Sequence, residues 1–123
     1  MKIITFFIFI FLSIVTIITE LYLSKLGLGD PVRYDSNFIY GYAPKENQSK
    51  IRLKGSKVTI NDVGLRSVIN WKNNNSKKII FFGDSITYGG SYIDDEETFS
   101  YLICKKTENY ICGNAGVNAY SII

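Results

Sequence analysis

The chain has 123 residues, of which 46% are hydrophobic and 15% aromatic, and this composition excludes a disordered or collagen-like protein. Its length allows one domain of ordinary size. The formal charge of +3 comes from 14 Lys+Arg against 11 Asp+Glu, and because the basic residues are scattered along the chain, they give no sign of nucleic-acid binding.

The first element is a long apolar segment. Residues Ile3–Thr19 carry no charge, and the apolar character continues to Leu23, a length that matches the hydrocarbon core of a bilayer. No small-x-small cleavage site follows, so an uncleaved signal anchor over residues 1–24 is favoured over a cleaved signal peptide. A buried core helix is disfavoured because the segment is apolar on all sides. The positive-inside rule places the rest of the chain outside the cytoplasm. We therefore expect a single-pass membrane protein that contacts the lipid bilayer through residues 3–23.

Residues 25–76 form the second region. Its first half is rich in Gly, Pro, Asn and Tyr without a sustained period, which predicts a tether and loop. Two strand-like runs, Ile51–Leu53 and Lys57–Ile60, flank a Gly-Ser pair and predict a short hairpin. Asn61–Arg66 follows as a turn.

Residues 77–123 have the pattern of an α/β domain. The segment Lys78–Phe82, with the continuous apolar run Ile79–Phe82, predicts a strand that is buried on both faces. A helical segment follows, and Tyr110–Cys112 predicts a second strand. Strand, loop, helix and strand in this order are typical of the beginning of a parallel sheet. The last residues, Asn118–Ile123, resemble the opening of a further helix.

The helical segment is Thr98–Lys106. It places Phe99, Leu102 and Ile103 on one side at spacings of three and four, which predicts an amphipathic helix. Acidic residues precede it and lysines end it, in agreement with the helix dipole.

Two cysteines, Cys104 and Cys112, lie in this helix and in the second strand. They show no C-x-x-C spacing typical of zinc or redox sites. Two buried packing thiols are the favoured interpretation. A disulfide is the alternative, and it requires an oxidising compartment.

The segment that indicates chemistry is IIFFGDSITYGG, residues Ile79–Gly90. The apolar strand stops at Gly83, which allows a sharp turn, so the hydroxyl of Ser85 is expected at the carboxyl edge of the sheet, where open α/β folds place their sites. A short helix that begins at or just after Ser85 would direct backbone amides toward the space above this hydroxyl, and such amides stabilise an oxyanion.

With its strand, the G-D-S-x-T-x-G segment from Gly83 to Gly89 resembles the first block of the SGNH/GDSL hydrolase family. The segment Asn114–Tyr120 resembles the second block of that family, and Asn61–Arg66 is similar to an N-x-x-G-[FL]-R segment of membrane-anchored members. The resemblance covers residues 77–123. It implies an α/β fold, the start of a flavodoxin-like three-layer parallel sheet that is truncated in this chain.

The resemblance also implies roles for individual residues. Ser85 corresponds to the nucleophile, and its own amide and that of Gly116 correspond to the two oxyanion donors. Gly83, Asp84 and Asn114 have supporting roles: Asp84 caps the turn and Asn114 braces the second loop. The implied reaction is attack on an acyl ester, with hydrolysis and transfer both open, and O-acylated cell-envelope glycans are the candidate substrates. No cofactor or metal is implied.

A general base is missing, because the chain contains no His and therefore lacks the family's D-x-x-H. A serine hydroxyl is a weak nucleophile until a base takes its proton. Asp94 and Asp95 are expected to be exposed carboxylates, which are too weakly basic. Lys77 and Lys78 precede the strand and so lie at the wrong end of the sheet.

The chain is therefore predicted to be an inactive N-terminal fragment of such an enzyme. The alternative is a non-catalytic, membrane-tethered module that binds a glycan or a protein through its aromatic segment Tyr34–Tyr42.

Overall fold

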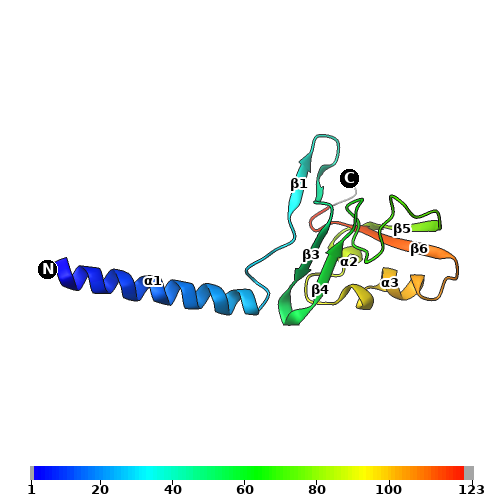
Figure 1. Cartoon of the computed structure of the whole chain (residues 1–123). Coiled ribbons are helices and arrows are strands. Elements are labelled where there is room, and N and C mark those ends of the chain that lie inside the picture. Colours follow the sequence, from blue (N-terminus) through cyan, green and yellow to red (C-terminus); the bar gives the residue numbers. More distant parts are fainter. Residues whose placement is uncertain (1, 121–123) are drawn as a thin grey trace.

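The computed structural model describes residues 2–120, which form a long N-terminal helix followed by a mixed α/β domain (Figure 1). Helix α1 (Lys2–Lys25) has 24 residues, and its apolar side chains are exposed along its whole length. At 1.5 Å per residue it is about 36 Å long, which exceeds the roughly 30 Å hydrocarbon core of a bilayer. It is thus long and apolar enough to span a membrane, as predicted.

The hydroxyl groups inside α1 are compatible with a lipid environment. Ser13, Thr16 and Thr19 each donate to the backbone carbonyl four residues earlier, at 2.9 Å. These bonds matter because an unsatisfied polar group is costly in hydrocarbon.

Two antiparallel hairpins follow α1, and only the second was predicted. Strand β3 (Gln48–Ile51) pairs with β4 (Lys57–Ile60), so the first strand begins three residues before the predicted one. The turn between them is the 3₁₀ helix η1 (Leu53–Gly55), which contains the predicted strand residue Leu53.

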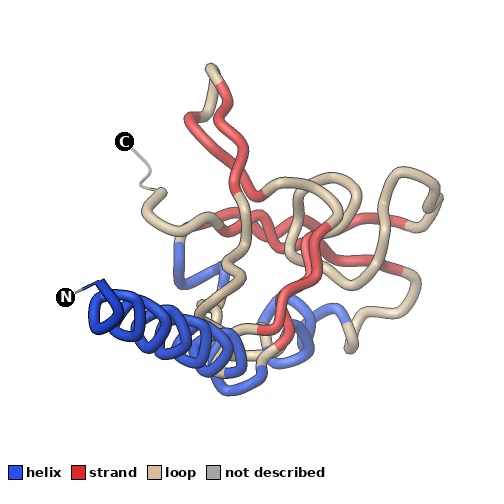
Figure 2. The backbone as a smooth tube through the Cα atoms, turned by 60° about the vertical axis from the view of Figure 1, so that its left-hand side comes forward, coloured by secondary structure: helices blue, strands red, loops and turns tan. Residues whose placement is uncertain are grey.

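The other hairpin, β1 (Tyr34–Asn37) and β2 (Gly41–Pro44), corrects the prediction of a loop. Its turn is closed by the side chain of Asn37, which accepts from the amide of Ile39 at 2.8 Å, and by Gly41 at a φ of 81°. This hairpin projects from the rest of the domain (Figure 2).

The C-terminal half contains two parallel strands with short helices between them. In chain order, its elements are β5 (Lys77–Gly83), α2 (Ser85–Tyr88), η2 (Asp95–Glu97), α3 (Phe99–Cys104) and β6 (Tyr110–Gly116). Strands β5 and β6 pair in parallel from Lys77↔Tyr110 to Gly83↔Gly116, which confirms the predicted strand, helix, strand order. The described residues form no further parallel pair, and the larger three-layer sheet stays a prediction.

Arg66 links the two halves of the domain. Its backbone forms antiparallel bridges with Ile60 at the end of β4 and with Asn114 in β6. The buried apolar cluster beside this link is small and consists of Val58, Ile60 and Tyr88.

The β5–β6 pair is covered unevenly on its two faces. The face that carries Phe81 is covered by helices, and the Phe81 ring meets that of Phe99 in α3 at 5.5 Å. On the other face, Trp71 reaches over Gly113 in β6, but the cover stops there. Ile80 is 42% exposed and Phe82 79%, so the prediction that this strand is buried on both faces is wrong.

Helix α3 is shorter than predicted and buries a different side. Thr98 caps it, with the Thr98 hydroxyl accepting from the amide of Tyr101. The buried residues are Thr98 and Ser100, whereas Phe99, Leu102 and Ile103 on the predicted apolar side are 42–48% exposed, although the Phe99 ring still packs against Phe81. The polar side faces inward because the Ser100 hydroxyl accepts a hydrogen bond from the side-chain nitrogen of Asn114.

Cys104 and Cys112 form a disulfide with their Cα atoms 5.7 Å apart, which corrects the favoured interpretation of two free packing thiols. The bond is possible because a short turn brings the end of α3 back against the start of β6. The predicted helix at 118–123 is also not seen: residues 118 and 119 form a turn, and 121–123 lie outside the described residues.

Candidate functional site

The turn from β5 into α2 holds the G-D-S segment. The Asp84 carboxylate accepts from the amide of Ile86 at 2.9 Å and so acts as the N-terminal cap of the helix. Gly89 ends the helix in the left-handed conformation at a φ of 87°. Gly83 is required at the end of β5, because a Cβ atom there would lie 2.0 Å from the hydroxyl oxygen of Thr87.

Ser85 is the first residue of α2 and is exposed. Neither its hydroxyl nor its amide has a hydrogen-bond partner within residues 2–120. It follows directly on the carboxyl end of β5, beside the corresponding end of β6, where Gly116 pairs with Gly83. This edge of a parallel sheet is where open α/β folds place their sites.

Gly116 has a different environment from the one its predicted role requires. Its amide is buried and donates to the side-chain oxygen of Asn114 at 2.9 Å. A Cβ atom at Gly116 would lie 2.3 Å from the amide nitrogen of Tyr88, so the glycine allows α2 to approach β6. The amide is thus not presented as a free donor next to Ser85, and it can meet an oxyanion only after Asn114 releases it.

Asn114 connects three elements of the site. Beyond accepting from Gly116, its side-chain nitrogen donates to the carbonyl of Thr87 at 2.6 Å and to the hydroxyl of Ser100 at 3.2 Å. It is 2% exposed, so β6, α2 and α3 are held together by one buried amide.

An open cavity of about 1140 Å³ adjoins this edge. Its walls come from the β1–β2 hairpin, from the turn at residues 63–65 and from the carboxyl ends of β5 and β6, and they combine apolar and polar side chains. Gly83, Asp84 and Gly116 line it, but Ser85 does not. The predicted site residues therefore lie together at one edge, with the nucleophile candidate outside the cavity wall.

The bases considered from the sequence are all engaged elsewhere. Asp95 is buried and paired with Arg66 at 2.9 Å, which corrects its expected exposure. Asp94 accepts from the amide of Lys57 at 2.7 Å. Lys77 and Lys78 begin β5, at the end of the strand opposite to Ser85, as predicted.

Arg66 is the residue near the site whose role the sequence did not reveal. Its buried guanidinium donates to Asp95 and to the carbonyls of Tyr88, Gly90 and Ile93 at 2.7–2.8 Å, and so it holds the loop after α2. The available signal was its place at the end of the N-x-x-G-L-R segment.

The described part of the chain contains no cluster of three or more His, Cys, Asp or Glu side chains suited to a metal ion. Searches of family models, curated proteins and solved structures found no match to the chain.

Proposed function

We propose that this chain supplies the nucleophile of a serine ester hydrolase of the SGNH/GDSL type, held at a membrane by α1. One observation carries the proposal: Ser85 is exposed, its hydroxyl and amide lack partners within the described residues, and it opens a capped helix directly after a parallel strand. A serine placed in this way can approach a carbonyl carbon while its own amide faces the developing oxyanion.

In the proposed reaction, the Ser85 oxygen attacks the acyl carbonyl carbon, the bond to the leaving alcohol breaks, and an acyl-serine forms. The amide of Ser85 donates to the oxyanion, and that of Gly116 joins it once Asn114 turns away. The Ser85 proton must pass to a base. Because the chain contains no His, that base comes from outside this sequence, and the chain by itself is expected to be inactive.

The proposed substrate is an acyl ester, with O-acylated cell-envelope glycans as the candidate class. The cavity beside Gly83 and Asp84, at about 1140 Å³, is large enough for such a group, since small-molecule sites typically measure about 300–1,000 Å³. In the full three-layer sheet that we propose, β5 is an inner strand, and its exposed Ile80 and Phe82 are covered by further elements.

We further propose that α1 is an uncleaved anchor and that the domain lies outside the cytoplasm. The Cys104–Cys112 disulfide supports this side of the membrane, because disulfides persist in oxidising compartments. Carbonate extraction of membranes tests the anchor. Reduction followed by labelling with a membrane-impermeant maleimide, in right-side-out and inverted vesicles, tests the side. Labelling only in inverted vesicles would contradict the proposed orientation.

The nucleophile is tested with a fluorophosphonate probe and imidazole as the supplied base. We expect a mass adduct on Ser85 that increases with imidazole and is absent from Ser85→Ala. Ser49, which is exposed in β3, is an internal control for an unactivated serine. An adduct that forms on Ser85 no faster than on Ser49 would refute the nucleophile assignment.

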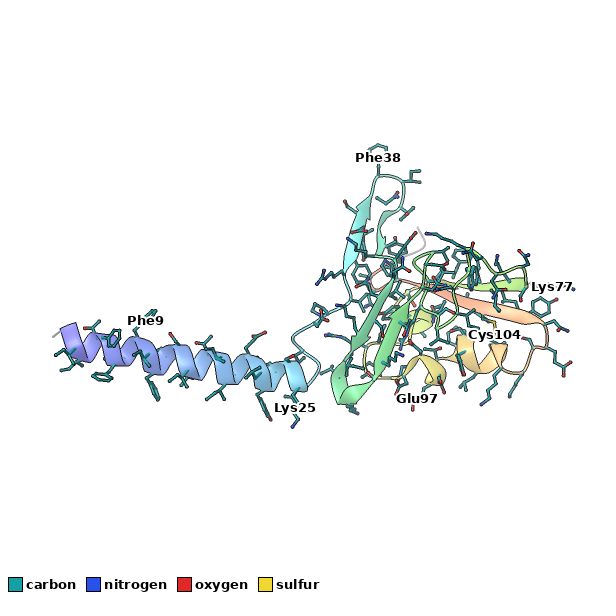
Figure 3. All side chains as sticks on the ribbon, in the orientation of Figure 1. Phe9, Lys25, Phe38, Lys77, Glu97 and Cys104 are labelled. Atoms are coloured by element: carbon teal, nitrogen blue, oxygen red, sulfur yellow. A yellow bond between two sulfur atoms is a disulfide. The ribbon has the colours of Figure 1, made fainter. Side chains whose placement is uncertain are left out.

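A second candidate function is a non-catalytic binding module, and the tip of the β1–β2 hairpin favours it. Phe38 is 104% exposed and Ile39 88%, and Figure 3 shows Phe38 at the outer end of the hairpin. Large exposed apolar side chains that lie together are typical of interaction sites. If this is the function, Phe38→Ser abolishes sedimentation of the chain with isolated cell-envelope glycan, whereas Ser85→Ala has no effect.

A further inference from the structure

The cavity beside the Ser85 edge has one wall that the β1–β2 hairpin supplies. Residues from both strands of the hairpin and from its turn line the cavity, and the opposite wall comes from the ends of β5 and β6 and from the turn at residues 63–65. At about 1140 Å³, the cavity exceeds the roughly 300–1,000 Å³ of a typical small-molecule site. It therefore has space for more of a substrate than a small acyl group.

Contacts with the segment after β6 hold the hairpin wall in place. The Tyr120 hydroxyl donates to the carbonyls of Tyr40 and Tyr42, and the Tyr42 hydroxyl donates to the carbonyl of Asn118. The rings of Tyr42 and Tyr120 meet edge to face, with their centroids 5.2 Å apart. Figure 1 shows the hairpin standing beside the end of β6. The cavity between them is thus formed before a ligand binds, which lowers the cost of binding.

Tyr40 contributes an aromatic ring to this wall. Its amide donates to the side-chain oxygen of Asn37 at 3.4 Å, and its carbonyl accepts from the Tyr120 hydroxyl at 2.8 Å, so its backbone is held. Its side chain lines the cavity and is 54% exposed. Phe82, which is 79% exposed, lines the opposite wall. The negative face of such a ring attracts the weakly positive C–H groups on the face of a sugar ring.

Polar side chains along the same wall are free to bind a ligand. Asp35, Lys45 and Asn47 line the cavity, and none of their side chains has a hydrogen-bond or ion-pair partner within the described residues. Sugar hydroxyls both donate and accept, so they can bond to a carboxylate, an ammonium and an amide group. An acyl chain offers these groups no hydrogen bond. Exposed rings beside unpaired polar groups therefore fit a sugar better than an acyl chain.

The charge of the cavity distinguishes between classes of sugar. Among the described residues, its lining holds three carboxylates, those of Asp35, Glu46 and Asp84, and the ammonium of Lys45. Lys72, outside the lining, pairs with Glu46 at 2.7 Å. Asp35 and Asp84 then remain against Lys45, so the net charge is negative. Repulsion between like charges disfavours a uronic acid or a phosphorylated sugar in this cavity.

From this arrangement we infer that the cavity is a subsite for an uncharged sugar unit, with Tyr40 stacked on the sugar ring and Asp35 and Asn47 bonded to its hydroxyls. The part that this subsite plays in catalysis rests on the function proposed above: the bound sugar carries the ester and holds it at the cavity rim nearest to Ser85. Sugar binding itself needs no catalysis. Phe38, at the hairpin tip, takes no part in it because its side chain does not line the cavity.

The test uses the full chain in micelles of a detergent without a sugar headgroup, because the residues after α1 are part of the domain. A Cβ atom at Gly27 would lie 2.2 Å from the carbonyl carbon of Arg52, and the Arg52 guanidinium donates to the Gly27 carbonyl at 2.7 Å. The probes are cellobiose, N,N′-diacetylchitobiose and cellobiouronic acid, which differs from cellobiose by its carboxylate. Saturation-transfer NMR detects binding, and titration gives the Kd. We expect both neutral disaccharides to bind, and cellobiouronic acid to bind about threefold more weakly than cellobiose.

Three variants locate the sugar. Tyr40→Ala removes the ring but keeps the backbone contacts with Asn37 and Tyr120, and it is expected to weaken cellobiose binding about tenfold. Phe38→Ala, on the same turn, is the matched control and should leave the Kd unchanged. Asp35→Asn should reduce the difference between cellobiose and cellobiouronic acid. A urea midpoint equal to that of the wild type shows that each variant is folded.

The subsite and the hydrolase can fail separately. If neither neutral disaccharide binds, if cellobiouronic acid binds as tightly as cellobiose, or if Phe38→Ala weakens binding as much as Tyr40→Ala, the subsite is refuted even where Ser85 reacts with the fluorophosphonate. If cellobiose binds through Tyr40 but Ser85 forms no adduct, the subsite stands and the hydrolase is wrong.

A competition experiment tests whether the subsite belongs to the ester site. Saturating cellobiose should slow the reaction of Ser85 with the fluorophosphonate in the wild type and have less effect in Tyr40→Ala. If bound cellobiose leaves the rate at Ser85 unchanged, the sugar does not lie next to the nucleophile, and its part in the proposed reaction is refuted.

Discussion

The guanidinium of Arg66 lies 2.9 Å from the carboxylate of Asp95, and the two side chains are only 1% and 6% exposed. The other carboxylate oxygen of Asp95 accepts from the amide of Thr59 in β4 at 2.8 Å. The backbone of Arg66 meanwhile bridges β4 and β6. One buried ion pair thus fastens the loop after α2 to both halves of the domain.

Removal of one partner of this pair is expected to destabilise the domain strongly. Arg66→Met leaves the buried Asp95 carboxylate unpaired and should lower the free energy of unfolding by about 3–5 kcal/mol. The midpoint of urea unfolding, followed by the fluorescence of Trp71, measures the loss. Lys72→Met breaks the exposed pair with Glu46 and serves as the control, with an expected change below about 1 kcal/mol. Equal losses in the two variants would contradict this account of the buried pair.

The disulfide is expected to stabilise the domain by restricting the unfolded chain. Cys104 and Cys112 are separated by eight positions, and closing a loop of that size contributes about 2–3 kcal/mol. The double variant Cys104→Ser/Cys112→Ala should therefore unfold at lower urea concentration. Dithiothreitol should shift the wild-type midpoint and leave that of the double variant in place; a wild type that does not respond would show that the bond is absent.

Two glycine-to-alanine variants distinguish the effect of packing between α2 and β6 from the effect of backbone strain. Gly116→Ala places a Cβ atom 2.3 Å from the amide nitrogen of Tyr88, so α2 must move and the loss should be about 3 kcal/mol. Gly55→Ala, at a φ of +77° with open space around it, should cost only about 1–2 kcal/mol. Because α2 carries Ser85, only Gly116→Ala should also reduce phosphonylation of Ser85. If the fluorophosphonate labels Ser85 equally in both variants, the packing of α2 on β6 does not position Ser85.

Stability is expected to fall in alkaline solution because of buried tyrosines. Burial, reinforced by the neighbouring Tyr34, raises the pKa of the Tyr88 phenol well above its ordinary value of 10.0. Burial likewise raises the pKa of Tyr34. The folded state holds the neutral phenols, so this stability is fully present below pH 10 and is lost as the pH rises above it, where the unfolded chain ionises first.

The variant Tyr88→Phe isolates this effect. The Tyr88 hydroxyl is buried and has no hydrogen-bond partner within the described residues, so its removal should change stability at pH 7 by less than about 1 kcal/mol. Urea midpoints between pH 8 and pH 11 should decline less steeply in Tyr88→Phe than in the wild type. If the urea midpoints of the wild type and of Tyr88→Phe decline equally steeply, the alkaline sensitivity comes from groups other than Tyr88.

The elements predicted from the sequence are those whose signals are local. The apolar run of α1, the Gly-Ser turn after Leu53 and the apolar residues of β5 each indicate their structure within a few positions. The G-D-S segment likewise predicted that Ser85 lies at the end of a strand, with a helix at or just after it, because the strand, Gly83 and the Asp84 cap are neighbours in the chain.

The features that were missed depend on distant contacts. Phe82 is 79% exposed, although Leu65 and Trp71 reach over Gly113 in the neighbouring strand, and no local pattern in the sequence shows how far these distant side chains cover the sheet. The amide of Gly116 is occupied because the Asn114 side chain turns toward it. Hydrogen bonds from the Asn114 side chain to Thr87 and Ser100, on other elements, fix this orientation.

The β1–β2 hairpin escaped prediction for another reason. Most of its residues are exposed or only partly buried, so no alternation of apolar and polar side chains marks its strands. Its turn depends on the side chain of Asn37, which accepts from the amides of Ile39 and Tyr40.

The close fit of Gly27 under the backbone of Arg52 has a mechanical consequence. A long flexible linker would let the domain rotate freely relative to α1. Here, hydrogen bonds from Lys50 in β3 and from Arg52 directly after it hold the residues that follow α1, Asp30 and Gly27. When α1 tilts or rotates about its axis, the domain therefore moves with it. In the membrane-anchored arrangement that we propose, a change in bilayer thickness that alters the tilt of α1 reorients the Ser85 edge together with the rest of the domain.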